Sequence, residues 1–137
     1  MQKTLTILKP DTVRSGNMGR IIERIEREAF RIRAMKMVHL TAPQAEGFYY
    51  VHKERPFFGS LVKFMTEGPV VLMVLEAEDA IRKLRQVMGA TDPLKAEPGT
   101  IRKEFGTNIE RNAIHGSDAP ETAAFEISYF FNQLEIF

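Results

Sequence analysis

The chain contains no cysteine among its 137 residues. This absence excludes disulfides, thiolate nucleophiles, iron–sulfur clusters and thiolate-ligated zinc sites, so the fold must be stable without covalent cross-links. An excess of charge of one sign is also absent, because 19 Lys and Arg residues balance 18 Asp and Glu residues and leave a net charge of +1. No overall field favours nucleic acid or an anionic membrane as a partner, and any basic binding site must be local.

Long apolar runs are missing as well. The longest spans residues 70–75, far below the ~20 apolar residues that a membrane span needs. The N-terminal apolar stretch is broken by Lys9 and Pro10 before it reaches the length of a signal peptide. Glycine and proline are few, at 9 and 7 residues, and 44% of the residues are hydrophobic, which indicates an ordered chain. We therefore expect one domain, residues 1–137, with a single core, in a soluble cytoplasmic protein.

The common phosphate-binding and metal-binding patterns do not occur either. The sequence contains neither G-x-x-x-x-G-K-[ST] nor G-x-G-x-x-G, which argues against a P-loop and against a Rossmann dinucleotide site. Its three histidines, at positions 39, 52 and 115, include no pair at i, i+4 spacing with a glutamate. The sequence therefore predicts no dedicated catalytic metal site.

Hydrophobic periodicity predicts alternating strands and helices. Strands are expected at residues 4–8, 31–40 and 70–75 and briefly after residue 112, and helices at residues 18–30, 41–49, 59–66 and 80–88. The strand at 70–75 has no polar alternation, which predicts burial on both faces. Residues 89–100, with two Pro and two Gly, are expected to form a long functional loop.

The last helix is expected to begin with Asp118 as its N-cap, Pro120 in its first turn and Glu121 completing a capping box. Its buried stripe is predicted to contain Ala124, Ile127 and Phe131. The full order predicts an α+β fold with a ferredoxin-like split βαβ core. Its parts are a four-stranded antiparallel sheet, a helical hairpin insert and a long loop before the last strand.

His115 is the residue with the clearest chemical potential. It precedes Gly116, whose missing side chain would let a ligand approach, and it lies just before a predicted helix N-terminus, which favours anions. Glu126 can orient the imidazole if the last helix folds back over the strand, and a neutral imidazole can attack phosphorus without a separate base. The alternative is a histidine hydrogen-bonded for packing. His39 and His52 are expected to be structural or surface residues.

A polyphosphate ligand would need several cationic groups. Lys9, Arg55, Arg85 and Arg102 all stand at the ends of predicted elements or beside loops, where their side chains can converge. The alternative is that each is an ordinary solvated charge in a chain of which 27% is charged.

Seven ordered blocks make the chain resemble the nucleoside diphosphate kinase family over nearly its whole length. They are Ile-Leu-Lys-Pro-Asp at 7–11, Gly-Phe-Tyr at 47–49, His-Lys-Glu-Arg-Pro-Phe-Phe at 52–58, Gly-Pro-Val-Val at 68–71, Met-Gly-Ala-Thr-Asp-Pro at 88–93, Pro-Gly-Thr-Ile-Arg at 98–102 and Asn-Ala-Ile-His-Gly-Ser-Asp at 112–118. The resemblance implies transfer of the γ-phosphate of a nucleoside triphosphate to a nucleoside diphosphate in two half-reactions. His115 would carry the phosphate between them as phosphohistidine.

The resemblance also implies roles for the other site residues. Glu126 would orient the histidine ring, and Ser117 would hydrogen-bond to this carboxylate. The rest match residues that hold the nucleotide: Lys9, Tyr49 and Asn112 around the transferred phosphate and the ribose hydroxyls; Arg85, Thr91 and Arg102 at the β- and γ-phosphates; Phe57 and Ile109 on the two sides of the base. Mg²⁺ would be held mainly by the nucleotide phosphates, and stacking would tolerate every base.

Two other classes of protein are weighed against this one. A non-catalytic ferredoxin-like domain that binds nucleotide for regulation would have no need of both His115 and Arg102, which are present. A nucleic-acid-binding sheet is disfavoured by the +1 charge and by the lack of interleaved basic and aromatic residues on one strand. Small departures from the family pattern are Ala119, where serine is frequent, and Asp92, where asparagine is common.

The assembly is expected to be a homo-oligomer built from dimers. Four apolar residues are predicted to be too many for one small core and so to favour association: Ile21, Ile25, Phe130 and Phe131. The resemblance implies a tetramer or a hexamer, with the loop at residues 89–100 contributing to hexameric contacts. The sequence ends at Phe137 without the longer tail of many relatives, which favours the tetramer.

Overall fold

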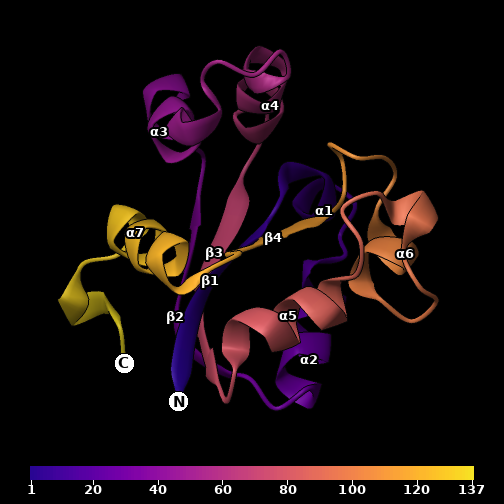
Figure 1. Cartoon of the computed structure of the whole chain (residues 1–137), viewed down its shortest axis with the longest axis vertical. Coiled ribbons are helices and arrows are strands. Elements are labelled where there is room, and N and C mark those ends of the chain that lie inside the picture. Colours follow the sequence, from indigo (N-terminus) through magenta and orange to yellow (C-terminus); the bar gives the residue numbers. More distant parts are fainter.

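The computed structural model describes residues 1–137 as a four-stranded antiparallel sheet flanked by helices (Figure 1). The strands are β1 (Gln2–Leu8), β2 (Arg31–Val38), β3 (Val70–Ala77) and β4 (Ile114–Gly116), in the spatial order β2-β3-β1-β4. Because β1 and β3 occupy the centre of the sheet and β2 and β4 its edges, this is the predicted ferredoxin-like arrangement. The α+β fold class is therefore confirmed.

Helices cover both faces of this sheet. They are α1 (Pro10–Arg14), α2 (Met18–Arg27), α3 (Ala42–Phe48), α4 (Phe58–Met65), α5 (Ala80–Met88), α6 (Ile101–Phe105) and α7 (Pro120–Phe130), with short 3-10 turns η1 (Tyr50–His52), η2 (Pro93–Lys95) and η3 (Gln133–Glu135). In Figure 1, α3 and α4 form a hairpin beyond one end of the sheet, α7 lies along one side of it, and α5 and α2 lie together on the other. None of the helices has the length and apolar character required to cross a bilayer.

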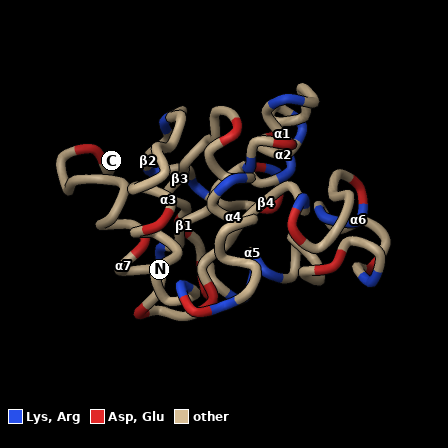
Figure 2. Tube along the Cα trace, turned by 90° about the horizontal axis from the view of Figure 1, so that it is seen from above, with Lys and Arg blue, Asp and Glu red and all other residues tan.

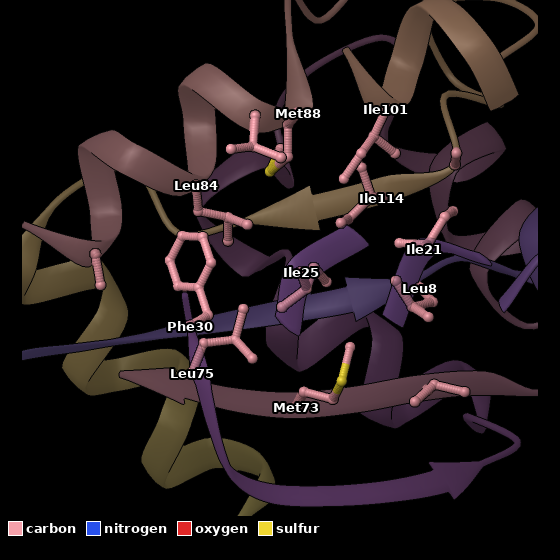
Figure 3. Packing of buried hydrophobic residues seen from close by; sticks show 14 of the residues in the cluster. Leu8, Ile21, Ile25, Phe30, Met73, Leu75, Leu84, Met88, Ile101 and Ile114 are labelled. Carbon is pink, nitrogen blue, oxygen red and sulfur yellow. The ribbon is translucent and has the colours of Figure 1, made fainter. Parts of the chain in front are cut away.

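The apolar core is divided into two clusters by the sheet, which corrects the expectation of a single core. Alternate residues of β3 enter opposite clusters: Val71 and Met73 pack with α2 and α5, whereas Leu72 and Val74 pack with α3, α4 and α7. Figure 3 shows the first cluster filling the space between the sheet and these two helices. The prediction that this strand is buried on both faces is confirmed.

Because the sheet has an apolar cluster on each face, the prediction that the apolar residues are too many for one core, and so favour association, is wrong. Ile21 and Ile25 are fully buried between α2 and the sheet, and Phe131 is buried on the opposite face, with Phe130 partly buried beside it. These residues do not compete for one small core, because the sheet provides two apolar faces. They therefore do not form an exposed surface that requires a partner.

Local features explain where sequence periodicity was imperfect. The mixed alternation in β2 reflects an irregularity in its pairing with β3 between Ile32 and Ala34, which shifts the side chains by one register. Helix α2 ends at Arg27, before the predicted end at residue 30, because Ala29 takes the left-handed conformation with φ of 69°. Helix α3 begins with a capping box, in which the Thr41 hydroxyl accepts from the Gln44 N–H and the Gln44 side chain accepts from the Thr41 N–H.

The beginning of α7 differs from the prediction. Its N-cap is Ala119, and the backbone N–H of Ala119 donates to Oγ1 of Thr122, so Asp118 and Glu121 do not form the predicted cap. Asp118 instead accepts a hydrogen bond from the Thr122 hydroxyl. The helix consequently buries Ala123, while Ala124 is exposed.

Lys and Arg residues are interspersed with Asp and Glu residues along the chain trace (Figure 2). The loop at 89–100 contains the short turn η2, whose N-cap Asp92 accepts a hydrogen bond from the Leu94 N–H. The loop leads into α6, which carries Arg102 towards the sheet edge at β4. The long loop is thus an ordered connection to α6, whose Arg102 lies against β4.

Candidate active site

A cavity of about 550 Å³ lies where the α3–α4 hairpin, the chain between α5 and β4, and the start of α7 meet. Every predicted site residue except Ser117 lines it: Lys9, Tyr49, Phe57, Arg85, Thr91, Arg102, Ile109, Asn112, His115 and Glu126. These residues come from positions spread over more than a hundred residues of sequence. Arg55, which was predicted to join the cation cluster, does not line the cavity and is exposed.

His115 stands on β4 at one wall of this cavity. The strand holds its backbone opposite Ile7 of β1, and the Thr6 hydroxyl donates to its carbonyl oxygen at 2.7 Å. Its ring packs edge-on against Phe48, with 5.5 Å between ring centroids. The histidine is therefore held both at its backbone and at its ring.

Glu126 sets the chemical form of this imidazole. Helix α7 passes back over the sheet and brings Oε1 of Glu126 to 2.9 Å from Nε2 of His115. The Ser117 hydroxyl donates to the same oxygen at 2.6 Å, from just behind the cavity. Since a carboxylate can only accept, Nε2 carries the proton, and Nδ1, to which no protein group is bonded, keeps its lone pair.

Two cations lie buried at the cavity floor. Lys9 Nζ donates to Oδ1 of Asn112 at 2.7 Å, and Arg102 donates to the carbonyls of Gly89 and Ile114 at 3.2 and 2.8 Å. Burial lowers the pKa of Lys9 to about 8, and Arg102 adds to this effect, while Asp11 and Glu110 oppose it.

Arg102 is affected in the same way. Burial and then Arg85 lower the pKa of its guanidinium to about 10. Its Nε is buried without a hydrogen-bond partner. Charges that are desolvated and close to one another repel, so this group of cations favours a polyanion.

The side-chain amide of Asn112 connects Lys9 at the cavity floor to the backbone of the neighbouring loops. Its Nδ2 donates to the carbonyls of Thr91 and Ile109 at 3.0 and 3.1 Å, while its Oδ1 accepts from Lys9. One amide side chain thus links the Lys9 ammonium to the backbone of the segments that contain Thr91 and Ile109.

Tyr49 supplies a neutral donor. Its ring is buried and its hydroxyl has no partner within the protein. Burial and then the charge of Glu126 raise its pKa, so the phenol keeps its proton.

The mouth of the cavity is apolar. Phe57 and Ile109 line it while remaining 46% and 65% exposed, and the His52 ring lies 5.5 Å from that of Phe57. Large apolar side chains exposed at the mouth of a charged cavity suit a planar ring that enters between them.

The sequence analysis missed several lining residues, among them Phe48, Val51, His52, Leu61, Glu110 and Thr122. His52 was expected to be structural or on the surface, although it begins the block His-Lys-Glu-Arg-Pro-Phe-Phe at 52–58 that matches the family. Gly116 lines the cavity and has a second role that the sequence did not indicate. A Cβ there would meet Met88 Sδ at 2.6 Å, so the missing side chain also lets β4 pack against α5.

No group of three or more His, Cys, Asp or Glu side chains lies together in a way that could hold a metal ion. The carboxylates that line the cavity are Glu110, Asp118 and Glu126, and Glu126 is already bonded to His115 and Ser117. The cavity thus combines a histidine that is bonded to a carboxylate, His115 with Glu126, and a set of cations.

Known proteins share this sequence and structure. A model of the nucleoside diphosphate kinase family matches residues 2–136. The nucleoside diphosphate kinase of Desulfosudis oleivorans is 61% identical over 136 residues, which covers 99% of this chain and 98% of that protein. That of Trichlorobacter lovleyi is 60% identical, with 99% of each chain covered.

Solved structures agree. The nucleoside diphosphate kinase of Aquifex aeolicus superimposes with a TM-score of 0.97 at 50% identity, with 99% of both chains covered. That of Halobacterium salinarum, solved in complex with CDP, has a TM-score of 0.96 at 40% identity and covers 99% of this chain and 91% of its own. The chain therefore belongs to the nucleoside diphosphate kinase family and transfers phosphate from nucleoside triphosphates to nucleoside diphosphates.

Proposed function

We propose that His115 is the nucleophile of this transfer and that the reaction proceeds in two half-reactions. The observation that carries the proposal is the bond from Nε2 of His115 to Glu126, which leaves Nδ1 unprotonated in a cavity lined by Lys9, Arg85 and Arg102. A neutral imidazole nitrogen needs no base to attack phosphorus.

The first half-reaction forms a bond between Nδ1 and the γ-phosphorus and breaks the bond from that phosphorus to the β–γ bridging oxygen. The nucleoside diphosphate leaves with the electron pair of the broken bond. The ring keeps its proton on Nε2 and gains positive charge, which the Glu126 carboxylate stabilises across 2.9 Å. The second half-reaction reverses these steps with a different nucleoside diphosphate as acceptor.

The cations stabilise the phosphate oxygens during transfer. Lys9 and Arg102 are held by hydrogen bonds to Asn112 and to backbone carbonyls, so they are oriented before substrate binds. Positioning and charge neutralisation provide most of the catalysis of phosphoryl transfer. We assign Arg85, Arg102 and Thr91 to the β- and γ-phosphates, and Tyr49 as a neutral donor near the transferred group.

The nucleoside would extend towards the mouth of the cavity. We place the ribose near Lys9 and Asn112 and the base between Phe57 and Ile109, whose exposed apolar surfaces suit stacking. The complex of the Halobacterium salinarum relative with CDP supports nucleotide binding in a fold of this kind.

Mg²⁺ is the proposed cofactor. Since the cavity carboxylates form no cage, the ion would be held mainly by phosphate oxygens, with Asp118 and Glu110 available to bind its water ligands. Mg²⁺ would supply further charge neutralisation on the phosphates.

We also propose a homo-oligomer built from dimers, on residues other than those predicted from the sequence. The edge strand β2 exposes Met35 and Met37, which are 54% and 51% accessible. Apart from the bond from the Phe137 N–H to the Arg33 carbonyl, its outer edge is unpaired, as is typical of strands that pair with a second chain. Light scattering tests this: we expect four times the mass of one chain, six times would give the hexamer, and the mass of one chain would contradict association.

The cytoplasm remains the proposed location, in keeping with a cysteine-free chain. Cell fractionation tests it, and enrichment in a membrane or secreted fraction would contradict it.

Phosphoenzyme labelling tests the proposed function. The protein is incubated with γ-labelled ATP and Mg²⁺, and we expect label that resists base and is released by acid, as a phosphoramidate is. H115A should retain no such label. H52A is the matched control, because His52 also lines the cavity but has no carboxylate partner, and it should label. Equal labelling of H115A and wild type would contradict the assignment, and no label on either would support a purely regulatory nucleotide-binding domain.

A further inference from the structure

The residues just before His115 adopt a strained turn. Ala113 has a φ of +75°, and the Ile114 N–H donates to the Asn112 carbonyl at 2.9 Å, which closes a three-residue γ-turn. This turn is rare because a side chain at its centre is crowded by the backbone. It is fully buried, and it connects Asn112, which holds Lys9, to the strand that carries His115.

The turn is held by one neighbouring segment, the connection from β1 into α1 (Figure 1). The Lys9 N–H and the Thr12 hydroxyl donate to the Ala113 carbonyl at 2.9 and 2.8 Å. Oδ2 of Asp11 accepts from the Ala113 N–H at 3.1 Å. Strained backbone persists only where its surroundings over-determine it, and here both peptide groups of Ala113 are bonded to the same segment.

We propose that Asp11 is a positioning residue for phosphate transfer, because its carboxylate holds Ala113 in the turn that places Asn112 beside Lys9 and His115 on the cavity wall. This inference rests on the proposed function, since it assigns Asp11 a role in the reaction at His115. Asp11 itself does not line the cavity.

The charge of Asp11 has a second effect at the same place. Burial and Arg102 of α6 lower the pKa of Lys9, and the negative charges of Asp11 and of Glu110, in the loop before β4, oppose this lowering. Asp11 therefore helps Lys9 to remain an ammonium ion above neutral pH. Removing its charge should lower the pKa of Lys9 below its present value of about 8.

A double-mutant cycle tests the geometric part. D11A removes the acceptor, and we expect at least a tenfold slower phosphoenzyme formation in a single turnover. Glycine adopts a positive φ without strain, so in the A113G background the same D11A change should slow the reaction less than threefold. A29G is the matched control, because Ala29 has a similar φ of +69° at the end of α2, outside the cavity, and this variant should label at the wild-type rate.

The pH profile provides a readout that a merely structural role would not move. D11N keeps an oxygen that can accept from the Ala113 N–H but loses the charge. Its kcat/KM should begin to fall at a lower pH than that of the wild type, by half a pH unit or more, because Lys9 loses its proton earlier.

The inference is overturned if D11A forms the phosphoenzyme as fast as the wild type, or if D11A slows this step by the same factor with and without A113G. It is also overturned if kcat/KM of D11N begins to fall at the same pH as that of the wild type. If D11A does not fold, the pH dependence of kcat/KM of D11N decides alone. A wild-type protein that forms no phosphohistidine would instead refute the proposed function. The two failures are thus distinguishable.

Discussion

Replacing Glu126 tests whether the carboxylate behind His115 contributes to the reaction. Its Oε1 receives hydrogen bonds from Nε2 of His115 at 2.9 Å and from the Ser117 hydroxyl at 2.6 Å, in a place where the carboxylate is only 13% exposed. In the proposed reaction, positive charge develops beside this carboxylate as phosphorus bonds to the ring. The interaction is therefore stronger in the transition state than in the ground state, which is the condition for catalysis.

The expected size follows from the type of bond. A hydrogen bond to a charged group contributes about 1.5–3 kcal/mol, and about 1.4 kcal/mol corresponds to a tenfold change in rate. E126A should therefore lower kcat about 10- to 150-fold. E126Q keeps an acceptor and loses the charge, so its loss of about 1–2 kcal/mol should lower kcat about 5- to 30-fold.

Steady-state assays with saturating nucleoside triphosphate and diphosphate measure kcat, and circular dichroism checks the fold of each variant. E121Q is the matched control, because Glu121 lies on the same helix, is exposed and has no hydrogen-bond partner within the protein, so this variant should match the wild type. A folded E126A with kcat within twofold of the wild type would refute the reasoning. So would an equal loss in E121Q.

Three further predictions address pH, packing and base recognition. Because burial lowers the pKa of Lys9 to about 8, kcat/KM of the free enzyme should fall as the pH rises through about 8, where the ammonium loses its proton; a flat profile from pH 7 to 9.5 would contradict this. G116A should lower the free energy of unfolding in urea by about 1–3 kcal/mol, because a Cβ would meet Met88 Sδ at 2.6 Å, whereas G59A, with no atom within 4 Å, should not. Equal losses in both variants would show that packing is not the cause. Adenine, guanine, cytosine and uracil diphosphates should all accept phosphate with Mg²⁺ present, because Phe57 offers stacking and no pattern of donors; strict rejection of pyrimidines in relative kcat/KM would contradict it.

Local pattern was sufficient to predict most of the fold. The uninterrupted apolar run from Val70 indicated a strand buried on both faces, and β3 is the strand that lies between β1 and β2 with a cluster on each side. The helical spacing of apolar residues at 80–88 matched the bounds of α5. These elements bury a whole face or both faces, so the hydrophobic effect acts at a regular period that the sequence displays.

Predictions of detail failed where one residue's conformation, one hydrogen bond or one strand pairing set the structure. Helix α2 ends before the left-handed residue Ala29, and α7 begins where the Ala119 N–H bonds to the Thr122 hydroxyl. The buried residue of α7 is Ala123 rather than Ala124. The alternation of β2 depends on its pairing with β3, a segment distant in the sequence. Such choices are between states of similar local free energy, so the hydropathy pattern alone does not decide them.

At the site, the sequence by itself determined the chemistry. The block around His115 indicated the nucleophile that we propose, and the resemblance to a known family implied the roles that we propose for Glu126, Lys9 and Arg102. What only the tertiary structure decided is the geometry: one carboxylate oxygen shared by His115 and Ser117, and the exclusion of Arg55 from the cations.

The strained turn at Ala113 is another feature that only the tertiary structure decided. Alanine has no sequence preference for a positive φ, and the turn exists because Asp11 and Thr12, about a hundred residues earlier, bond both of its peptide groups. A local sequence pattern reports the preferences of neighbouring residues. Hydrogen bonds between distant segments exist only after the sheet has formed, and here they hold the turn that leads into His115.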